Sequence, residues 1–273
     1  MSFVEVRNLH LGYREEGSGA PIVFLHGVGS DKALWDRQLK HFSKKWRAVA
    51  LDYPGYGESE LAPHDLKRAE IVEYLCDALD ALGIEAAHFV GLSMGGVILL
   101  EMWRQQPSRL SSMVLADTFA RHPDARSIVE RAHHALATMT MREFAELRVP
   151  LVLRPDTTDE LKREVIENMA RINPQSYKWA AEAVWTPDYR ADLASIDIPA
   201  LIIVGEHDKL TPLALSEELL AGIESAKLKV IPDAGHISNI DNPAAFNRIV
   251  EAFFASLESA ESFSGARREN ARN

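Results

Sequence analysis

The sequence of 273 residues lacks three features that would each place it in a particular environment. Cys76 is the only cysteine, so no disulfide can form within the chain, and no apolar run approaches the ~20 residues needed to span a bilayer. The first residues, MSFVEVRNLHLGYREEG, have no basic start followed by an apolar block, as a secretory signal would. We therefore expect a cytoplasmic protein that has no membrane partner.

Basic charge is also scarce, because 30 Lys and Arg face 40 Asp and Glu and leave a formal net charge of −10. An acidic surface repels phosphate backbones, so nucleic acid is excluded as a partner. No pair of His, Asp, Glu or Cys has metal-ligand spacing within a helix or hairpin, so we expect neither a metal nor a cofactor. The expected partner is a small molecule, and the sequence carries no signal for an oligomeric state.

Short apolar runs bounded by Gly and Pro alternate with helical patterns along most of the chain. Residues 3–14 predict a strand or hairpin, and Thr211 and Asn242 each precede a proline as predicted helix N-caps. The alternation predicts a parallel sheet with helices on both faces, its strands buried on both sides. The predicted strands lie within 21–27, 47–57, 86–93, 110–118, 199–208 and 226–236, and the predicted helices are 31–44, 67–82, 94–106, 212–223 and 243–257.

Residues 119–191 break this alternation, since four segments there look helical and none looks like a strand. We expect a helical cap over 119–191, inserted into a core made of 1–118 and 192–258; the alternative is a run of surface helices of the same domain. Trp179 and Trp185 in this region could face a pocket or belong to the core. The polar segment 259–273 is expected to be a flexible tail.

The stretch HFVGLSMGGVILLEM, residues 88–102, puts a serine between an apolar strand pattern and an apolar helical pattern. Gly91 and Gly95 flank Ser93 in the spacing Gly-x-Ser-x-Gly, and they remove Cβ atoms that would clash in a sharp strand-to-helix turn. Such a turn holds the serine oxygen out over the carboxyl edge of the sheet. Ser93 is therefore the candidate nucleophile.

A serine nucleophile needs a base, and the base needs an orienting carboxylate. His236 follows the last apolar strand and Asp208 follows the one before it, so both are expected at the same sheet edge as Ser93. Asp117, one strand earlier, is the alternative carboxylate, with a second possible role in binding backbone amides where the chain leaves for the cap. We prefer Asp208, because Gly205 lets the strand end turn sharply and aim the carboxylate under His236.

Acyl transfer also needs two hydrogen-bond donors for the oxyanion. The amide of Met94, at the start of a helix, is one candidate. The loop after the strand IVFLHG offers the amide of Val28 as the other. We expect His26 in that loop to hold the turn by hydrogen bonding to the backbone rather than to act as a base.

Five stretches between about 20 and 255 resemble the successive signatures of the α/β-hydrolase superfamily: FLHGVGSD, LDYPGYGES, VGLSMGGV, GEHDKLTP and DAGHISNIDNPAAF. The third and fifth most resemble 3-oxoadipate enol-lactonases and related small esterases. The resemblance implies an eight-stranded, mostly parallel sheet, a helical cap inserted after the sixth strand, and a Ser-Asp-His triad without cofactor. The second stretch lacks the arginine that commonly precedes Gly-x-Gly in those lactonases, so the resemblance leaves the substrate open.

These observations predict a hydrolase of carboxylic esters or lactones that forms an acyl-enzyme on Ser93. One alternative on the same fold is a carbon–carbon hydrolase of ring-cleavage products, for which we would expect a polar residue in place of Leu92. Another is a signalling receptor that keeps the triad but turns over very slowly. A haloalkane dehalogenase would need aspartate at position 93.

Overall fold

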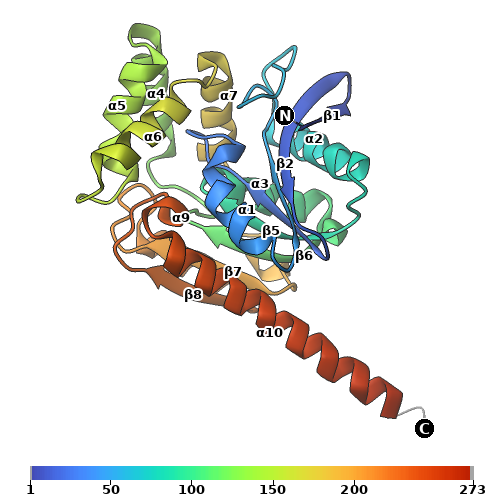
Figure 1. Ribbon diagram of the computed structural model, residues 1–273. Coiled ribbons are helices and arrows are strands. Elements are labelled where there is room, and N and C mark those ends of the chain that lie inside the picture. Colours follow the sequence, from blue (N-terminus) through green and yellow to red (C-terminus); the bar gives the residue numbers. More distant parts are fainter. Residues whose placement is uncertain (1, 271–273) are drawn as a thin grey trace.

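Eight strands form one sheet in the computed structural model, which describes residues 2–270 (Figure 1). The order across the sheet is β1-β2-β4-β3-β5-β6-β7-β8. The first two strands form the predicted hairpin, β2 is antiparallel to β4, and all other neighbours are parallel. The strands are β1 (Ser2–Val6), β2 (Leu9–Glu16), β3 (Pro21–Leu25), β4 (Arg47–Leu51), β5 (Ala87–Leu92), β6 (Leu110–Ala116), β7 (Ala200–Gly205) and β8 (Ala226–Ile231).

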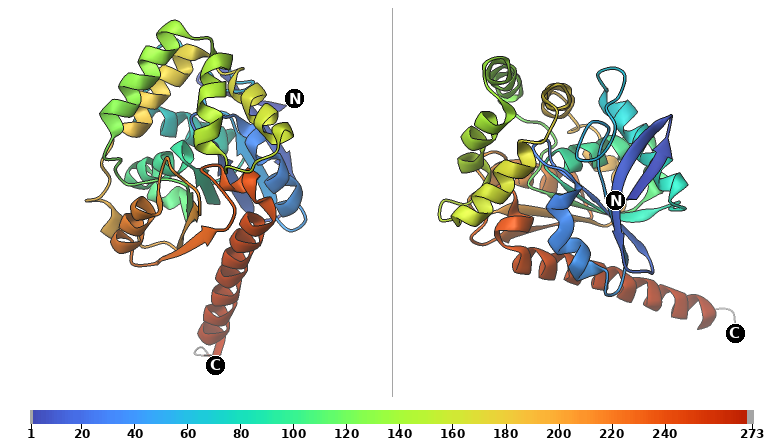
Figure 2. Two further views of the ribbon diagram at one scale, coloured as in Figure 1. Left: turned by 90° about the vertical axis from the view of Figure 1, so that its left-hand side faces the viewer. Right: turned by 45° about the horizontal axis from the view of Figure 1, so that its top comes forward.

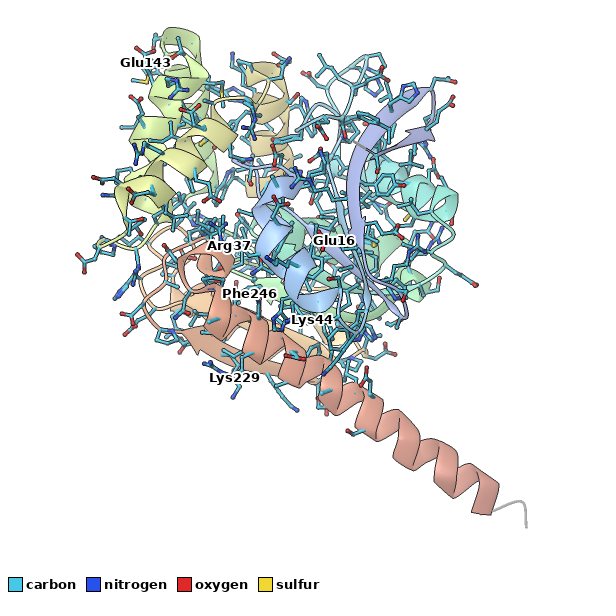
Figure 3. The ribbon with its side chains drawn as sticks, in the orientation of Figure 1. Glu16, Arg37, Lys44, Glu143, Lys229 and Phe246 are labelled. Atoms are coloured by element: carbon cyan, nitrogen blue, oxygen red, sulfur yellow. The ribbon has the colours of Figure 1, made fainter. Side chains whose placement is uncertain are left out.

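The central strands are buried on both faces, as their apolar sequences predict. Along β3, for example, Ile22 and Phe24 enter one hydrophobic core, while Val23 and Leu25 enter the other. The same prediction is wrong for β8, most of whose residues are half-buried or exposed. This strand is the edge of the sheet, and its Lys229 lies at the outside of the molecule (Figure 3). Lysine on an edge strand discourages pairing with another chain.

Helices cover both faces of the sheet (Figure 2). One face packs against α1 and α10, and the other against α2, α3 and α8. A 3-10 turn at Lys32–Trp35 leads into the first helix, and Trp35 packs in the core beneath it. The helices outside the insert are α1 (Asp36–Phe42), α2 (Arg68–Ala81), α3 (Met94–Gln105), α8 (Leu213–Gly222), α9 (Ser238–Asp241) and α10 (Pro243–Asn270).

The segment between β6 and β7 forms a helical insert, seen at the upper left of Figure 1. Its four helices are α4 (Ala125–Thr138), α5 (Met141–Val152), α6 (Asp159–Met169) and α7 (Pro174–Trp185). Trp179 and Trp185 are buried in the hydrophobic core that the insert shares with the sheet. The insert therefore follows the sixth strand, as expected.

The C-terminal segment, for which a flexible tail is expected, continues α10 as helix to Asn270. Asn242 caps this helix as predicted, since its Oδ1 accepts a hydrogen bond from the amide of Ala245 at 3.2 Å. Residues 259–270 contain Gly265 but no proline, the residue that is most unfavourable inside a helix. Residues 271–273 lie outside the described part. Within residues 2–270, no helix has the length and hydrophobicity needed to cross a bilayer.

Candidate active site

Ser93 stands at the junction of β5 and α3 in a strained backbone conformation, with φ of 53°. A Cβ atom at Gly95 would lie 2.2 Å from the carbonyl oxygen of Leu25, and one at Gly91 would lie 2.4 Å from the backbone of Gly95. Neither position has room for a side chain. The two glycines thus allow the close packing that a sharp turn at Ser93 requires.

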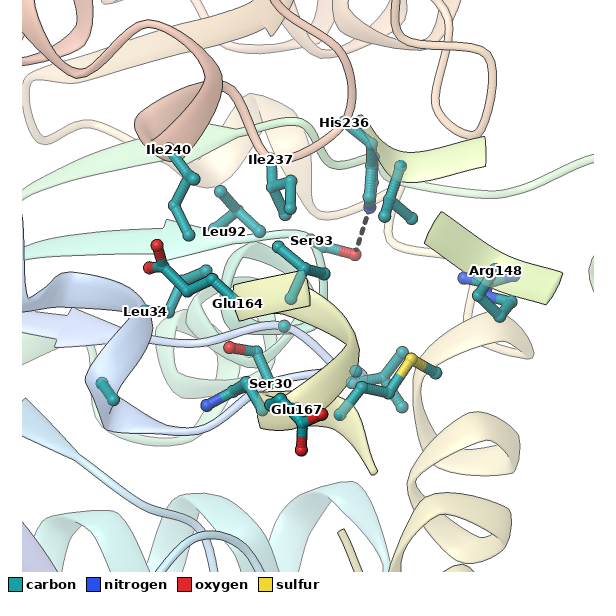
Figure 4. Close-up of a pocket in the computed structure, with 18 of the residues that line it drawn as sticks. Ser30, Leu34, Leu92, Ser93, Arg148, Glu164, Glu167, His236, Ile237 and Ile240 are labelled. Atoms are coloured by element: carbon teal, nitrogen blue, oxygen red, sulfur yellow. Dashed lines mark hydrogen bonds between the residues drawn. The ribbon is translucent and has the colours of Figure 1, made fainter. Parts of the chain in front are cut away.

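His236 lies in the loop between β8 and α9, and its imidazole bridges Ser93 and Asp208. The dashed line in Figure 4 marks the contact with Ser93. Its Nε2 is 2.9 Å from Ser93 Oγ, and its Nδ1 is 2.9 Å from Asp208 Oδ2. Because a carboxylate can only accept, Nδ1–H donates to Asp208, and Nε2 accepts from the serine hydroxyl. All three side chains are buried. The geometry therefore leaves Nε2 in position to take the proton of Ser93.

Four hydrogen bonds hold the carboxylate of Asp208 in the turn after β7. Its Oδ1 accepts from the amides of Leu210 at 2.8 Å and Thr211 at 2.9 Å, while Oδ2 accepts from the Thr211 hydroxyl at 2.6 Å and from His236. Burial by itself would raise the pKa of Asp208, but attraction to His236 and these hydrogen bonds outweigh it and hold the pKa below its ordinary value. The carboxylate is thus both ionised and fixed in orientation.

Thr211 does not cap a helix as the sequence predicted. Pro212 occupies the N-cap position of α8, and the Thr211 hydroxyl binds Asp208 instead. A threonine before a proline fits both roles equally well in sequence, so the pattern could not separate them. The spacing Asp-x-x-Thr is the signal that could have identified this contact.

Asp117, the alternative carboxylate, makes no hydrogen bond to His236 within residues 2–270. Its Oδ1 accepts from the amide of Gly205 at 2.8 Å, and its Oδ2 accepts from the hydroxyl of Ser238 at 2.5 Å. Burial, and then repulsion by Asp208, raises the pKa of Asp117 well above its ordinary value. It joins the ends of β6 and β7 to the start of α9, which is the backbone-binding role that the sequence analysis left open.

The amides of Val28 and Met94 are the two predicted oxyanion donors. Val28 borders the same cavity as Ser93, and Met94 is the first residue of α3. Across residues 2–270, neither amide donates a hydrogen bond to another backbone group. A buried N–H without a partner favours an acceptor supplied by a ligand.

The loop that carries Val28 is held by side chains from beneath. The Tyr53 hydroxyl donates to the carbonyl of His26 at 3.3 Å, and the Tyr56 hydroxyl donates to the carbonyl of Val28 at 3.2 Å. His26 Nδ1 lies 2.9 Å from the carbonyl oxygen of Gly27, and burial lowers the pKa of this imidazole. His26 therefore supports the turn, as expected. Both tyrosines belong to LDYPGYGES, the stretch that departs from the lactonase pattern.

A cavity of about 300 Å³ lies between these core loops and the helices α5 and α6 of the insert (Figure 4). Ser93, His236 and Val28 all border it, whereas Trp35, Trp179 and Trp185 do not. Its wall is apolar in part and charged in part. The larger apolar residues are Leu34, Leu92, Val152, Val165, Met169, Ile237 and Ile240, and the charged ones are Asp36, Arg148, Glu164, Glu167 and Arg171.

A second group of polar side chains lies outside this cavity, in the turns after β7 and β8. Glu206, His207 and Asp233 offer possible metal-ligand atoms within 4.8 Å of one another, although the sequence analysis expected no ligand set. All three are exposed, and Glu206 already accepts a hydrogen bond from the Asp233 amide at 3.1 Å. None of them borders the cavity at Ser93, and we assign no ion to them.

Known proteins with similar sequences include several hydrolases. The chain is 31% identical to 3-oxoadipate enol-lactonase 1 of Acinetobacter baylyi over 87% of this chain and 89% of that protein. It is 29% identical to 2-hydroxy-6-oxo-6-phenylhexa-2,4-dienoate hydrolase of Comamonas testosteroni, over 88% of this chain and 90% of that one. The similarity thus extends to both ester-cleaving and carbon–carbon-cleaving enzymes.

The fold is shared as well. The crystal structure of the enol-lactonase from Burkholderia xenovorans superposes with a TM-score of 0.87 at 28% identity, covering 93% of this chain and all of that one. The sequence pattern described as alpha/beta hydrolase fold matches residues 20–243, which include Ser93, Asp208 and His236. Because that pattern spans most of the chain and the sheet has the order and helical insert described above, the chain belongs to the α/β-hydrolase family.

Proposed function

We propose that this protein hydrolyses carboxylic esters or lactones through an acyl-enzyme on Ser93. The observation that carries the proposal is the chain of hydrogen bonds from Ser93 through His236 to Asp208, with both links 2.9 Å long. It ends at a cavity large enough for a small substrate. In this proposal residues 1–118 and 192–258 form the catalytic core, and 119–191 form the cap that covers the site.

The chemistry follows from the positions of these atoms. Ser93 Oγ attacks the carbonyl carbon while His236 Nε2 takes its proton, and Asp208 stabilises the resulting imidazolium. The amides of Val28 and Met94 bind the oxyanion. The imidazolium then protonates the leaving alkoxide as its bond to the acyl carbon breaks, so the acyl group stays on Ser93; the alcohol departs from an ester and stays attached to the acyl group from a lactone. His236 next takes a proton from water as the water oxygen attacks the acyl carbon. The imidazolium returns this proton to Ser93 Oγ as the bond between Oγ and the acyl carbon breaks, which releases the acid.

The test is a panel of p-nitrophenyl esters, enol-lactones and ring-cleavage dienoates assayed with the wild type and with Ser93→Ala. We expect ester or lactone hydrolysis by the wild type, a loss of at least about 10³-fold in kcat on substitution, and an unchanged circular-dichroism melt. Near-wild-type activity of Ser93→Ala would contradict the proposal.

Carbon–carbon hydrolysis is the second candidate, favoured by the similarity to the dienoate hydrolase of Comamonas testosteroni. Leu92, which borders the cavity beside Ser93, opposes it, because we expect a polar residue there in such enzymes. Cleavage of dienoates faster than of any ester or lactone would decide for this candidate. Intact mass spectrometry tests the receptor alternative. In that case a single slow turnover would leave a lasting covalent adduct on Ser93.

A further inference from the structure

The cavity beside Ser93 carries Arg148 on one side only. Leu34, Ile240 and Glu164 lie on one side of Ser93 in Figure 4, and Arg148 lies on the other. Arg148 belongs to α5 of the insert, so this charge reaches the cavity from outside the core. A substrate bound at Ser93 would therefore have a cationic group at one end of its site.

The other charged residues of the cavity wall are already neutralised by neighbours. Each forms an ion pair with a residue of opposite charge. Two of these pairs join different helices, one between α1 and α6 and one between α5 and α6. The pairs are Asp36 with Arg14, Glu164 with Arg37 at 2.7 Å, Glu167 with Arg142 at 2.6 Å, and Arg171 with Asp31 at 3.2 Å. The acidic side chains of the wall thus leave little uncompensated negative charge to repel an anion.

Arg148 differs from all of them. Its Nε atom is buried without a hydrogen-bond partner, and no ion pair involves its guanidinium within residues 2–270. A guanidinium has five N–H donors, no acceptor, and stays charged at all relevant pH values. Taking such a group partly out of water without a partner is unfavourable, so an anion from a ligand would satisfy it.

The position of Arg148 relative to the candidate base is fixed by hydrogen bonds at the end of its helix. The carbonyl of Val152, one turn beyond Arg148, accepts from the amide of Ile237, next to His236, at 3.1 Å. Asp241 Oδ2 accepts from the amides of Arg154 and Gly235, both at 2.8 Å. The same few residues therefore hold the arginine and the histidine loop in one arrangement before any substrate binds.

We propose that Arg148 binds a carboxylate of the substrate at a distance from the bond that is cleaved. The substrate class is then an ester or lactone whose acyl part carries a second, free carboxylate, such as a monoester of a dicarboxylic acid. The planar guanidinium fork matches the two oxygens of a carboxylate. This inference rests on the proposed hydrolase function, since it names the substrates of the same site.

The kinetic test compares two p-nitrophenyl esters of glutaric acid, one with a free second carboxylate and one with that carboxylate methylated. We expect the wild type to prefer the free acid by at least about 10-fold in kcat/KM, and Arg148→Met to abolish that preference mainly through KM. Arg148→Lys should keep part of it, because lysine keeps the charge but not the fork.

A matched control removes the same charge elsewhere on the cap. Arg163 of α6 is 69% exposed, pairs with Glu160 and does not border the cavity, so Arg163→Met should leave the preference within about twofold of the wild type. The thermal melt of Arg148→Met should be unchanged or raised, because a half-buried charge without an ion-pair partner has been removed. An unaltered preference in Arg148→Met, or a wild type that prefers the methylated ester, would overturn the inference.

A binding measurement separates this inference from the proposed function. Glutarate and monomethyl glutarate are titrated into the wild type and into Arg148→Met by calorimetry, with no turnover required. We expect Arg148→Met to bind glutarate at least about 10-fold more weakly. If neither ester is hydrolysed but glutarate binding still depends on Arg148, the hydrolase proposal fails and the anion site stands. Equal binding by the two proteins would overturn the anion site, even if both esters are hydrolysed.

Discussion

The core wall and the cap wall of the cavity differ in how their residues are held. On the core side, Ser93 and His236 are 3% and 4% exposed, and backbone contacts at Gly91 and Gly95 leave no room for adjustment. On the cap side, the ion pair between Arg37 and Glu164 joins side chains that are 37% and 48% exposed. Exposed pairs of this kind contribute about 0–1 kcal/mol.

Under the proposed function, this difference would separate two tasks, proton transfer on the core side and substrate selection on the side of the insert. Proton transfer requires atoms placed to within a few tenths of an ångström, which buried hydrogen bonds and glycine contacts provide. Selection among substrates requires a wall whose side chains can change without disturbing that geometry. The insert meets the second requirement, because helices α5 and α6 contribute cavity residues but none of Ser93, Asp208 and His236. Substitutions should therefore have their largest effects on the core side.

The largest effect on kcat is expected when Asp208 is replaced, and the comparison is with Asp117, the alternative orienting carboxylate. Asp208→Asn should lower kcat by about 10²–10⁴, because the amide cannot hold the His236 tautomer that accepts the serine proton. Asp117→Asn should lower it by about 10-fold or less, since Asp117 binds Gly205 and Ser238 instead of His236. Steady-state hydrolysis of one good ester by both variants measures the difference.

The reverse ranking of these two variants would show that the acid acts from the end of β6. Ser93 and His236 would keep their proposed roles in that case, because neither assignment depends on which carboxylate orients the ring. Circular dichroism serves as the control that both variants fold.

A smaller effect, on the free energy of unfolding, should distinguish two sets of contacts between the insert and the core, one made by Asp241 and one by Arg37. Asp241 accepts hydrogen bonds from the amides of Gly235 and Arg154 and from the Thr157 hydroxyl, so Asp241→Ala should lower the free energy of unfolding by about 2–3 kcal/mol. Arg37→Gln removes the exposed ion pair with Glu164 and should change the free energy of unfolding by less than about 1 kcal/mol. Urea denaturation of both variants tests the contrast, and equal losses would mean that the cap is not anchored through Asp241.

The smallest effect is a difference in how stability depends on pH. The pKa of Asp208 is lowered in the folded state, so its contribution is complete above the unfolded value of about 3.9 and is lost as pH falls through the folded pKa. The pKa of Asp117 is raised, so the folded state loses stability relative to the unfolded state as pH rises above about 3.9 towards the folded pKa.

Urea denaturation at pH 4.5 and pH 7 of the wild type, Asp208→Asn and Asp117→Asn tests these signs. The stability difference between the wild type and Asp208→Asn should be nearly constant between the two pH values. The difference between the wild type and Asp117→Asn should move in favour of the variant at pH 7. A constant difference for Asp117→Asn would mean that this carboxylate is ionised throughout the range.

Features that depend on neighbouring residues in the chain were predictable from the sequence. The strand-to-helix turn at Ser93 follows from glycines two residues away on either side, and the Asn242 cap acts on an amide three residues on. The alternation of apolar runs and helical patterns likewise indicated the parallel sheet and the insert after the sixth strand. The turn and the cap depend on contacts within a few residues, and the strand and helix patterns are repeated within each short segment, so the local sequence contains the information.

The tertiary structure decided which groups from distant segments meet. The sequence could not choose firmly between Asp208 and Asp117, because the choice depends on how the ends of β6 and β7 lie under the His236 loop. It misassigned Thr211, whose partner is set by the turn after β7. It gave no sign that Arg148 lacks a partner, because the pairing of arginines and carboxylates depends on how α5 and α6 pack against the core. Hydrogen bonds and ion pairs form between atoms brought within about 3–4 Å by folding, and sequence patterns do not specify those distances.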